Sequence, residues 1–221
     1  MAIPRLHLGV IVLCALLGIA GVYVATPWLH YVFKPGTTLV IAALVLRAAE
    51  SERGYRTAIL AGLAFSTLGD VFLMLPGDRF VFGLASFLVA HLAYLFAFTR
   101  RAPFAAVRWP FFAYGAVAAG VAGILWPNLP DALRPPVAVY VVVLAAMAAQ
   151  AAVAWRRAPA QATACAALGG AFFVASDAML AIDRFVAPFA AARPSVLATY
   201  WIAQTLIALS VFNAQPRPGR G

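Results

Sequence analysis

Long apolar runs alternate with short polar breaks along the whole chain. Each run approaches the roughly 20 residues that an α-helix needs to cross a hydrocarbon core about 30 Å thick, and Arg, Pro and Gly collect in the breaks. The pattern predicts eight membrane-spanning helices, near 6–25, 29–46, 57–75, 80–98, 109–126, 136–155, 161–182 and 195–213. No break is long enough for a soluble domain, so we expect an all-α protein in which residues 1–221 form a single polytopic membrane domain.

The composition supports the same class of protein. Hydrophobic residues make up 65% of the chain and charged residues 10%, and the mean hydropathy is +0.93. A soluble domain cannot bury that much apolar surface. The net charge of +9 does not indicate a nucleic-acid partner, because arginines beside membrane spans serve to orient them. The first apolar run is too long for a signal peptide and further runs follow it, so we expect it to be retained as a helix.

The positive residues are divided unequally between the two sides of the predicted bundle. Eleven belong to the N-terminal segment, the even-numbered breaks and the C-terminal segment: Arg5, Arg47, Arg53, Arg56, Arg100, Arg101, Arg108, Arg156, Arg157, Arg217 and Arg220. Five belong to the other breaks: Lys34, Arg79, Arg134, Arg184 and Arg193. The positive-inside rule therefore places both termini in the cytoplasm, as an even number of spans requires.

Two parts of the chain resemble each other. The segments "GLAFSTLGDVFL" (62–73) and "GGAFFVASDAML" (169–180) match at Gly, Ala, Phe, Asp and Leu, and a "DRF" sequence follows each, at 78–80 and 183–185. Farther along, "FLVAHLAYLFAF" corresponds to "YWIAQTLIALSVF", which sets His91 against Gln204. We interpret the pattern as a parallel 4+4 repeat of helices, and repeated halves commonly form a site at their interface.

Two carboxyl groups lie inside predicted spans. Asp70 and Asp177 are each about a turn or more from a span end, where an ionisable side chain costs about 2.5–3.5 kcal/mol or more and commonly marks function. A helix-to-helix hydrogen bond is the purely structural alternative. The matched positions in the repeat favour function, and they predict that the two carboxyl groups share one depth in the outer half of the bilayer and approach each other. The other acidic residues fall in breaks or at helix ends: Glu50, Glu52, Asp78, Asp131 and Asp183.

Small and basic residues accompany the two aspartates. Ser66 lies one helical turn before Asp70 on the same face, and Gly62 lies a turn earlier, a pattern that suits close packing against another helix. Ser176 directly precedes Asp177. Lys34 is the sole lysine and lies near the outer end of the second predicted span. In the structural interpretation its side chain only snorkels to the interface. In the functional one it binds an anionic group such as a phosphate, or holds an aspartate ionised.

A histidine and three further polar side chains also lie within spans. His91 is the only histidine deep inside a predicted span, and Tyr94 shares its helical face. Tyr200 and Gln204 share one face of the last span. In the structural interpretation, His91 is a buried histidine whose ring nitrogens are hydrogen-bonded and which only packs against its neighbours. Its place opposite Gln204 in the repeat favours the other interpretation, in which it lies in the wall of a site.

Other kinds of site remain as alternatives. Zinc needs three or four ligands, and only His91, Asp70 and Asp177 could come together to supply them, without a His-x-x-x-His pair or a Cys cluster. A nucleophilic serine lacks the Gly-x-Ser-x-Gly sequence. The alternative from another class is a proton-coupled transporter or a lipid-binding membrane protein, because intramembrane Asp and His residues in a repeat also suit proton transfer.

Five blocks of sequence together resemble a known family. They are "FKPGTT", "GLAFSTLGDVFLML", "FVFGLASFLVAHLAYLFAF", "GGAFFVASDAMLAIDRF" and "YWIAQTLIA". In this order they resemble the blocks of the YhhN-like family of membrane proteins, the lysoplasmalogenases. The Ser-x-x-x-Asp, Gly-Leu-x-x-Phe-x-x-x-His-x-x-Tyr and Ser-Asp patterns are the specific ones, whereas the segment 109–155 carries little motif.

The resemblance implies a helical enzyme of a bacterial inner membrane that hydrolyses the vinyl ether bond of a lysoplasmalogen. The products would be a fatty aldehyde and glycerophosphoethanolamine or glycerophosphocholine, and no metal or organic cofactor would take part. The family's motif aspartates match Asp70 and Asp177, the expected catalytic pair. Residues expected to bind substrate or support the pair are Lys34, Ser66, His91, Tyr94, Ser176, Tyr200 and Gln204. The expected partners are the lysophospholipid substrate and membrane lipids, and both a monomer and a homodimer stay open.

Vinyl ether chemistry fits two carboxyl groups independently of the resemblance. A vinyl ether is stable to base but is cleaved by acid, because a proton on its β-carbon gives an oxocarbenium ion. One carboxyl group must therefore be protonated and act as general acid, a state that an apolar site favours. The second, as a carboxylate, would stabilise the cation and position water, as in glycoside hydrolysis. The sequence leaves open which aspartate takes which role.

Overall fold

The computed structural model describes residues 5–24, 27–48 and 52–212, and these form eight α-helices. The helices are α1 (Arg5–Tyr23), α2 (Pro27–Leu46), α3 (Arg53–Met74), α4 (Phe80–Thr99), α5 (Trp109–Leu125), α6 (Arg134–Arg157), α7 (Gln161–Phe185) and α8 (Ala192–Leu209). Two short 3-10 turns, η1 (Trp126–Asn128) and η2 (Asp131–Leu133), connect α5 to α6. No strand occurs within these ranges, so the prediction of an all-α chain is confirmed. Glu50, Arg217 and Arg220 lie outside the described residues.

Each helix overlaps one of the apolar runs, and most of the helices are long and apolar enough to cross a membrane. By length and composition, seven helices of the described chain qualify, α1 to α7. The chain is therefore a multi-pass membrane protein. The last helix, α8, is not among the seven because its 18 residues include Arg193 near the start and Gln204 in the interior. The eighth span stays a prediction.

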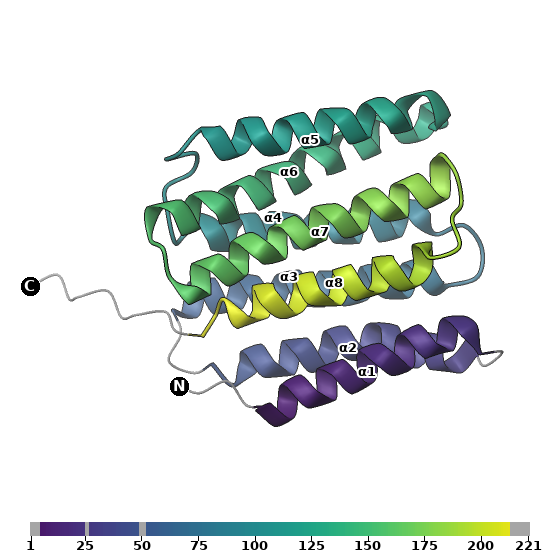
Figure 1. Ribbon diagram of the computed structural model, residues 1–221, viewed down its shortest axis with the longest axis horizontal. Coiled ribbons are helices and arrows are strands. Elements are labelled where there is room, and N and C mark those ends of the chain that lie inside the picture. The colour runs from purple at the N-terminus through teal and green to yellow at the C-terminus, as the bar shows by residue number, and fades with distance from the viewer. Residues whose placement is uncertain (1–4, 25–26, 49–51, 213–221) are drawn as a thin grey trace, which may run out of the picture.

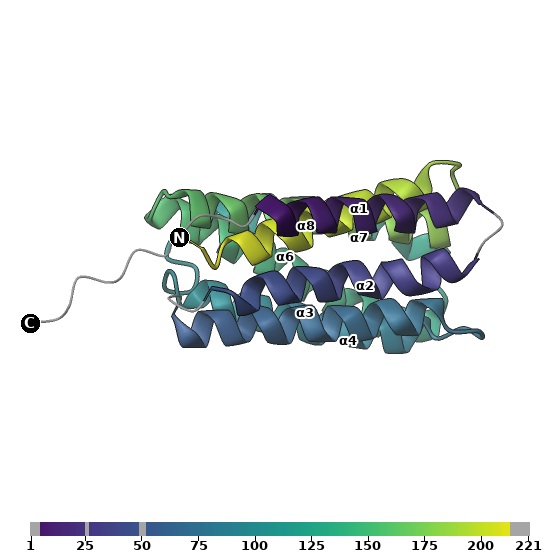
Figure 2. The same ribbon diagram turned by 90° about the horizontal axis from the view of Figure 1, so that it is seen from below.

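Consecutive helices run antiparallel, so α1 begins and α8 ends at the same end of the bundle (Figure 1). Figure 2 shows that the bundle is elongated, with α2, α3 and α4 on one side and α1, α7 and α8 on the other. The ends of α3 and α7 and the start of α2 all lie at the opposite end from the start of α1. This arrangement brings the later parts of α3 and α7 to the same level, which is where the sequence places Asp70 and Asp177.

Glycines allow close contact between the helices that carry the aspartates and their neighbours. A Cβ atom at Gly62 of α3 would lie 2.1 Å from Cε1 of Tyr94 in α4. At Gly169 of α7, the matching position in the repeat, a Cβ atom would lie 3.0 Å from the carbonyl oxygen of Ala203 in α8. Small residues let helix backbones approach closely in membranes, where packing rather than the hydrophobic effect joins helices. The glycines therefore fix α3 against α4 and α7 against α8.

A proline lies inside α2 next to the site. The helix continues through Pro35 from Pro27 to Leu46, beginning two residues earlier than predicted. Proline has no N–H to donate, so the helix loses one backbone hydrogen bond at this turn. The hydroxyl of Thr37 donates to the carbonyl oxygen of Phe33 at 2.6 Å and supports the same turn. The continuous helix sets Lys34 and Thr38 one turn apart on a single face.

Candidate functional site

A cavity lies among seven of the helices, α2 to α8, in the half of the bundle away from the start of α1. Its volume is about 130 Å³, which gives room for several water molecules. Most of the wall is apolar. The polar side chains that line it are those of Lys34, Asp70, Tyr114, Tyr140, Ser176, Asp177 and Tyr200. Both aspartates singled out by the sequence therefore face one cavity.

Asp70 is 1% exposed and is held by three partners. Its Oδ2 atom accepts a hydrogen bond from the hydroxyl of Tyr200 at 2.8 Å and another from the hydroxyl of Thr38 at 3.0 Å. Nζ of Lys34 lies 3.8 Å from Oδ1. A buried carboxylate is tolerated when it is paired and hydrogen-bonded, and here α2 and α8 supply both kinds of partner to α3.

Asp177 has a different set of neighbours, and its side chain is 15% exposed. The hydroxyl of Tyr140 in α6 donates a hydrogen bond to its Oδ2 atom. Nε2 of His91 in α4 lies 2.9 Å from that same tyrosine oxygen and 3.6 Å from Oδ2 of Asp177. His91 is fully buried. The imidazole, the phenol and the carboxyl group therefore form a chain that leads from the protein interior to the cavity.

The two carboxyl groups line one cavity, but the hydrogen bonds of the described residues do not join them directly. Phe173 lies between their surroundings: its ring centroid is 4.6 Å from that of His91 and 5.6 Å from that of Tyr200, both edge to face. Phe173 is itself fully buried. The site thus has two carboxyl groups with different hydrogen-bond partners on one cavity, and Phe173 packs against a residue from each set of surroundings.

The remaining residues named from the sequence lie around this cavity with different contacts. The hydroxyl of Tyr94 donates to Oε1 of Gln204 at 2.6 Å, so α4 is joined to α8. Both side chains are buried, as is Ser66, and these three residues do not belong to the cavity wall. Ser176 does line the cavity, and its hydroxyl donates to the carbonyl oxygen of Val196 at 3.1 Å. Any role of Ser66, Tyr94 and Gln204 would therefore be to support the site from behind.

Sequence reasoning did not single out two residues that the structure places in direct contact with the aspartates. Thr38 follows Lys34 by four residues, and the helical spacing could have revealed it. Tyr140 lies in the segment with little motif, within the apolar run "VAVYVVV", where a tyrosine resembles any other aromatic packing residue. Its only signal is a hydroxyl that needs a partner once it is buried inside a membrane span.

The zinc alternative finds no support in the side chains. In the described parts of the chain, no group of three His, Cys, Asp or Glu residues is placed to hold a metal ion. His91 and Asp177 approach each other, whereas Asp70 has a different set of partners. The chemistry available to the described groups is acid–base chemistry by two carboxyl groups in different hydrogen-bond settings.

An apolar extension adjoins the polar part of the cavity. A second hollow between α5 and α6 shares wall residues with the first, namely Ala118, Leu125, Val137, Val141 and Ala145. Its wall is made of Ala, Gly, Val, Leu, Phe and Trp residues. A polar end with two carboxyl groups and an adjoining apolar end suit an amphiphile whose chain follows α5 and α6.

Comparison with known proteins gives a consistent set of relatives. The model of the YhhN family matches residues 29–211. The chain is 34% identical over 167 residues to "Lysoplasmalogenase TMEM86A" of Homo sapiens, which covers 72% of this chain and 67% of the relative. It is 34% identical over 198 residues to "Lysoplasmalogenase" of Mycobacterium bovis, with 86% and 74% covered. "Uncharacterized membrane protein YhhN" of Escherichia coli is 25% identical over 201 residues, with 90% and 95% covered. No solved structure matches the chain.

Proposed function

The chain belongs to the YhhN family, and from that premise we propose that it is a lysoplasmalogenase, a hydrolase of the vinyl ether bond of lysoplasmalogens. Relatives named lysoplasmalogenase are about a third identical to it over most of its length. The observation that carries the proposal is a single cavity with an apolar extension, lined by two carboxyl groups that have different partners. This combination of groups suits acid-catalysed hydrolysis of a vinyl ether lipid.

The reaction consumes one water and needs both an acid and a base. A proton adds to the β-carbon of the vinyl ether, and the electrons of the double bond leave an oxocarbenium ion. Water attacks the carbon beside the oxygen and gives up a proton to the second carboxylate. The second carboxyl group then protonates the departing oxygen while the hemiacetal hydroxyl returns a proton to the first carboxylate, and the carbon–oxygen bond breaks to release a fatty aldehyde and the glycerophospho alcohol. The proton is returned, so the catalyst ends unchanged.

Asp177 is the proposed general acid. When it gives up its proton, the new carboxylate is stabilised at once by the hydroxyl of Tyr140, and Nε2 of His91 can donate to the tyrosine oxygen in turn. Its side chain is also the more exposed of the two, which suits a group that must touch the substrate. The His91–Tyr140–Asp177 chain would therefore support the charge that develops during the first step.

Asp70 is proposed to be the second group of the pair, a carboxylate that is already ionised when the substrate binds. The ammonium of Lys34 and the hydroxyls of Thr38 and Tyr200 all favour its anionic form. A fixed negative charge in an apolar cavity stabilises a developing oxocarbenium ion far better than it would in water. The same carboxylate can accept a proton from the attacking water, which enters the cavity beside it.

The membrane arrangement belongs to the proposal as well. We infer eight spans in one membrane domain, a parallel 4+4 repeat and both termini in the cytoplasm of a bacterium whose inner membrane holds the protein. Helix contacts support the repeat, because α3 packs on α4 as α7 packs on α8, and α2 packs on α8 as α6 packs on α4. Asp70 and Asp177 would then lie in the outer half of the bilayer. A homodimer stays a prediction, which the mass of the purified protein in detergent would test.

Release of fatty aldehyde tests the proposed function. Purified protein in detergent is incubated with a lysoplasmalogen, and the free aldehyde is measured in the absence of any gradient. Asp70→Asn and Asp177→Asn should each fold and lose the activity, since the reaction needs both carboxyl groups. Asp131→Asn is the matched control, because Asp131 is exposed and pairs with Arg134, away from the cavity wall. An Asp70→Asn or Asp177→Asn variant with near-full activity would refute the two-carboxylate mechanism.

A further inference from the structure

The two "DRF" sequences meet each other at the end of the bundle. Asp78 precedes α4 and Arg184 lies at the end of α7, and Nη2 of Arg184 is 2.9 Å from both carboxylate oxygens of Asp78. The rings of Phe80 and Phe185 pack edge to face with centroids 5.3 Å apart. Both phenylalanines line the cavity. Asp78 and Arg184, called the rim pair below, therefore lie at the rim of the cavity, directly beside its wall.

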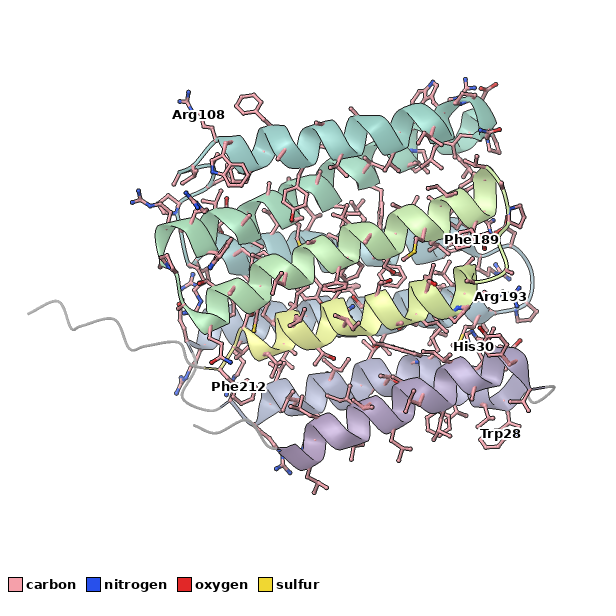
Figure 3. The ribbon with its side chains drawn as sticks, in the orientation of Figure 1. Trp28, His30, Arg108, Phe189, Arg193 and Phe212 are labelled. Carbon is pink, nitrogen blue, oxygen red and sulfur yellow. The ribbon has the colours of Figure 1, made fainter. Side chains whose placement is uncertain are left out.

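The rim pair is open to water on one side and apolar on the other. The Asp78 side chain is 72% exposed and that of Arg184 is 36% exposed. The guanidinium carbon of Arg184 lies 4.3 Å from the ring centroid of Phe80 and 5.4 Å from that of Phe185. Figure 3 places Phe189 and Arg193 at this same end, away from Arg108 and Phe212. An exposed ion pair of this kind exchanges partners easily, while the aromatic rings keep the guanidinium in place.

The separation of Arg184 from Asp177 fits the distance between the vinyl ether and the phosphodiester of a lysoplasmalogen. Seven residues of α7 separate them, which is about 10 Å along the helix axis. In a lysoplasmalogen a short glycerol unit separates the vinyl ether from a phosphodiester anion. If the vinyl ether lies beside Asp177 and the chain follows α5 and α6, the phosphodiester points toward the rim. Lys34, whose side chain lines the cavity, is already paired with Asp70.

We propose that Arg184 binds the phosphodiester of the substrate and that Asp78 occupies Arg184 when no substrate is bound. The inference rests on the proposed function, since it names the headgroup subsite of the same cavity. A guanidinium presents parallel N–H groups that match a phosphate as well as a carboxylate, so the phosphodiester replaces Asp78 without any change in the helix. The released carboxylate of Asp78 is then solvated, because it is already mostly exposed.

The chain supplies a matched control in the other "DRF" sequence. Arg79 has the same sequence neighbours as Arg184, but its guanidinium carbon lies 5.9 Å from the ring centroid of Phe82, which does not line the cavity, whereas Arg184 lies against two phenylalanines that do. Asp78 also accepts a hydrogen bond from the backbone N–H of Phe80 at 3.1 Å, which an asparagine can retain. Asp78→Asn therefore breaks the rim pair but keeps the start of α4.

A binding experiment with uncleavable ligands tests the inference. The probes are a 1-alkyl lysophosphatidylcholine, which has a saturated ether, and a 1-alkylglycerol of the same chain length, which has no phosphate. Dissociation constants are measured in mixed micelles for the wild type, Arg184→Gln, Arg79→Gln and Asp78→Asn. Arg184→Gln should weaken binding of the phospholipid roughly tenfold and leave the alkylglycerol unchanged. Asp78→Asn should tighten phospholipid binding, and Arg79→Gln should match the wild type.

Three results would overturn the proposed role of Arg184 in phosphate binding. If Arg184→Gln weakens both ligands alike, or if Asp78→Asn weakens phospholipid binding as Arg184→Gln does, the rim pair is only a structural link and the inference is wrong. A wild type that does not prefer the phospholipid overturns it too. Aldehyde release by the wild type is measured in parallel. If the predicted binding is observed but no aldehyde is released, the phosphate site is supported and the proposed hydrolysis is refuted.

Discussion

Nε2 of His91 lies 2.9 Å from the hydroxyl oxygen of Tyr140, although the two residues come from different helices and are 49 positions apart in the chain. The contact joins α4 to α6 behind the cavity. Because the same hydroxyl donates to Asp177, the tyrosine connects the imidazole to the carboxyl group. The pair gives the buried histidine a polar partner that the sequence alone did not reveal.

Removing the hydroxyl of this tyrosine should lower catalysis without unfolding the protein. Tyr140→Phe keeps the aromatic ring in its place but leaves Asp177 and His91 without the bridging hydrogen bonds. We expect kcat for aldehyde release to fall about tenfold or more, while KM changes little. Tyr114→Phe is the control, because Tyr114 also lines the cavity but contacts neither aspartate in the hydrogen bonds described above. Equal activities for the two variants would argue against the role of Tyr140.

The two aspartates should respond differently to acid. If Asp177 is the general acid, hydronium ion can take over its function, and Asp177→Asn should gain activity about tenfold for each unit of lower pH, above the protein-free rate. Asp70→Asn should show no such recovery, because acid does not restore a missing carboxylate. The measurement is aldehyde release against pH over the range in which both variants remain folded. Recovery by Asp70→Asn instead would exchange the two assigned roles.

The apolar pattern and the acidic residues revealed much of this molecule. Eight runs correspond to eight helices, because a membrane span must satisfy its own backbone hydrogen bonds and therefore has a length that shows in the sequence. Asp70 and Asp177 could be selected because a carboxyl group inside such a run is costly and rare. The structure places both of them in the wall of one cavity.

The partners of the aspartates could not be predicted in the same way. Which side chain meets Asp177 depends on the rotation of α6 about its axis, and the run around Tyr140 is apolar on every side, so no face of it is marked. The sequence correspondence of His91 with Gln204 also concealed a difference, since His91 contacts Tyr140 and Gln204 contacts Tyr94. The sequence likewise does not show that Phe173 packs edge to face against both His91 and Tyr200.

Loss of the lysine should destabilise the protein in a way that a second substitution repairs. Lys34→Met leaves the carboxylate of Asp70 buried without a counter-ion, and breaking a buried pair on one side costs about 3–5 kcal/mol. Adding Asp70→Asn removes the remaining charge, so the double variant should regain most of the thermal stability of the wild type. Both forms should be inactive. Thermal unfolding in detergent measures the structural contribution of Lys34, and aldehyde release measures the catalytic one. If the double variant is no more stable than Lys34→Met, the unpaired carboxylate is not the cause of the destabilisation.

Close packing at Gly62 should be necessary for the position of the site. A Cβ atom there would lie 2.1 Å from Cε1 of Tyr94, and the ring cannot move freely because its hydroxyl donates to Gln204. Gly62→Ala should therefore lower the free energy of unfolding by about 1–3 kcal/mol, the usual cost of overpacking. Gly115→Ala in α5 is the control, since nothing lies within 4 Å of a Cβ atom at that position and alanine favours a helix more than glycine does. Thermal unfolding of the two variants measures the difference. If Gly62→Ala is as stable as Gly115→Ala, the contact between α3 and α4 is not the constraint that sets Asp70 in the cavity wall.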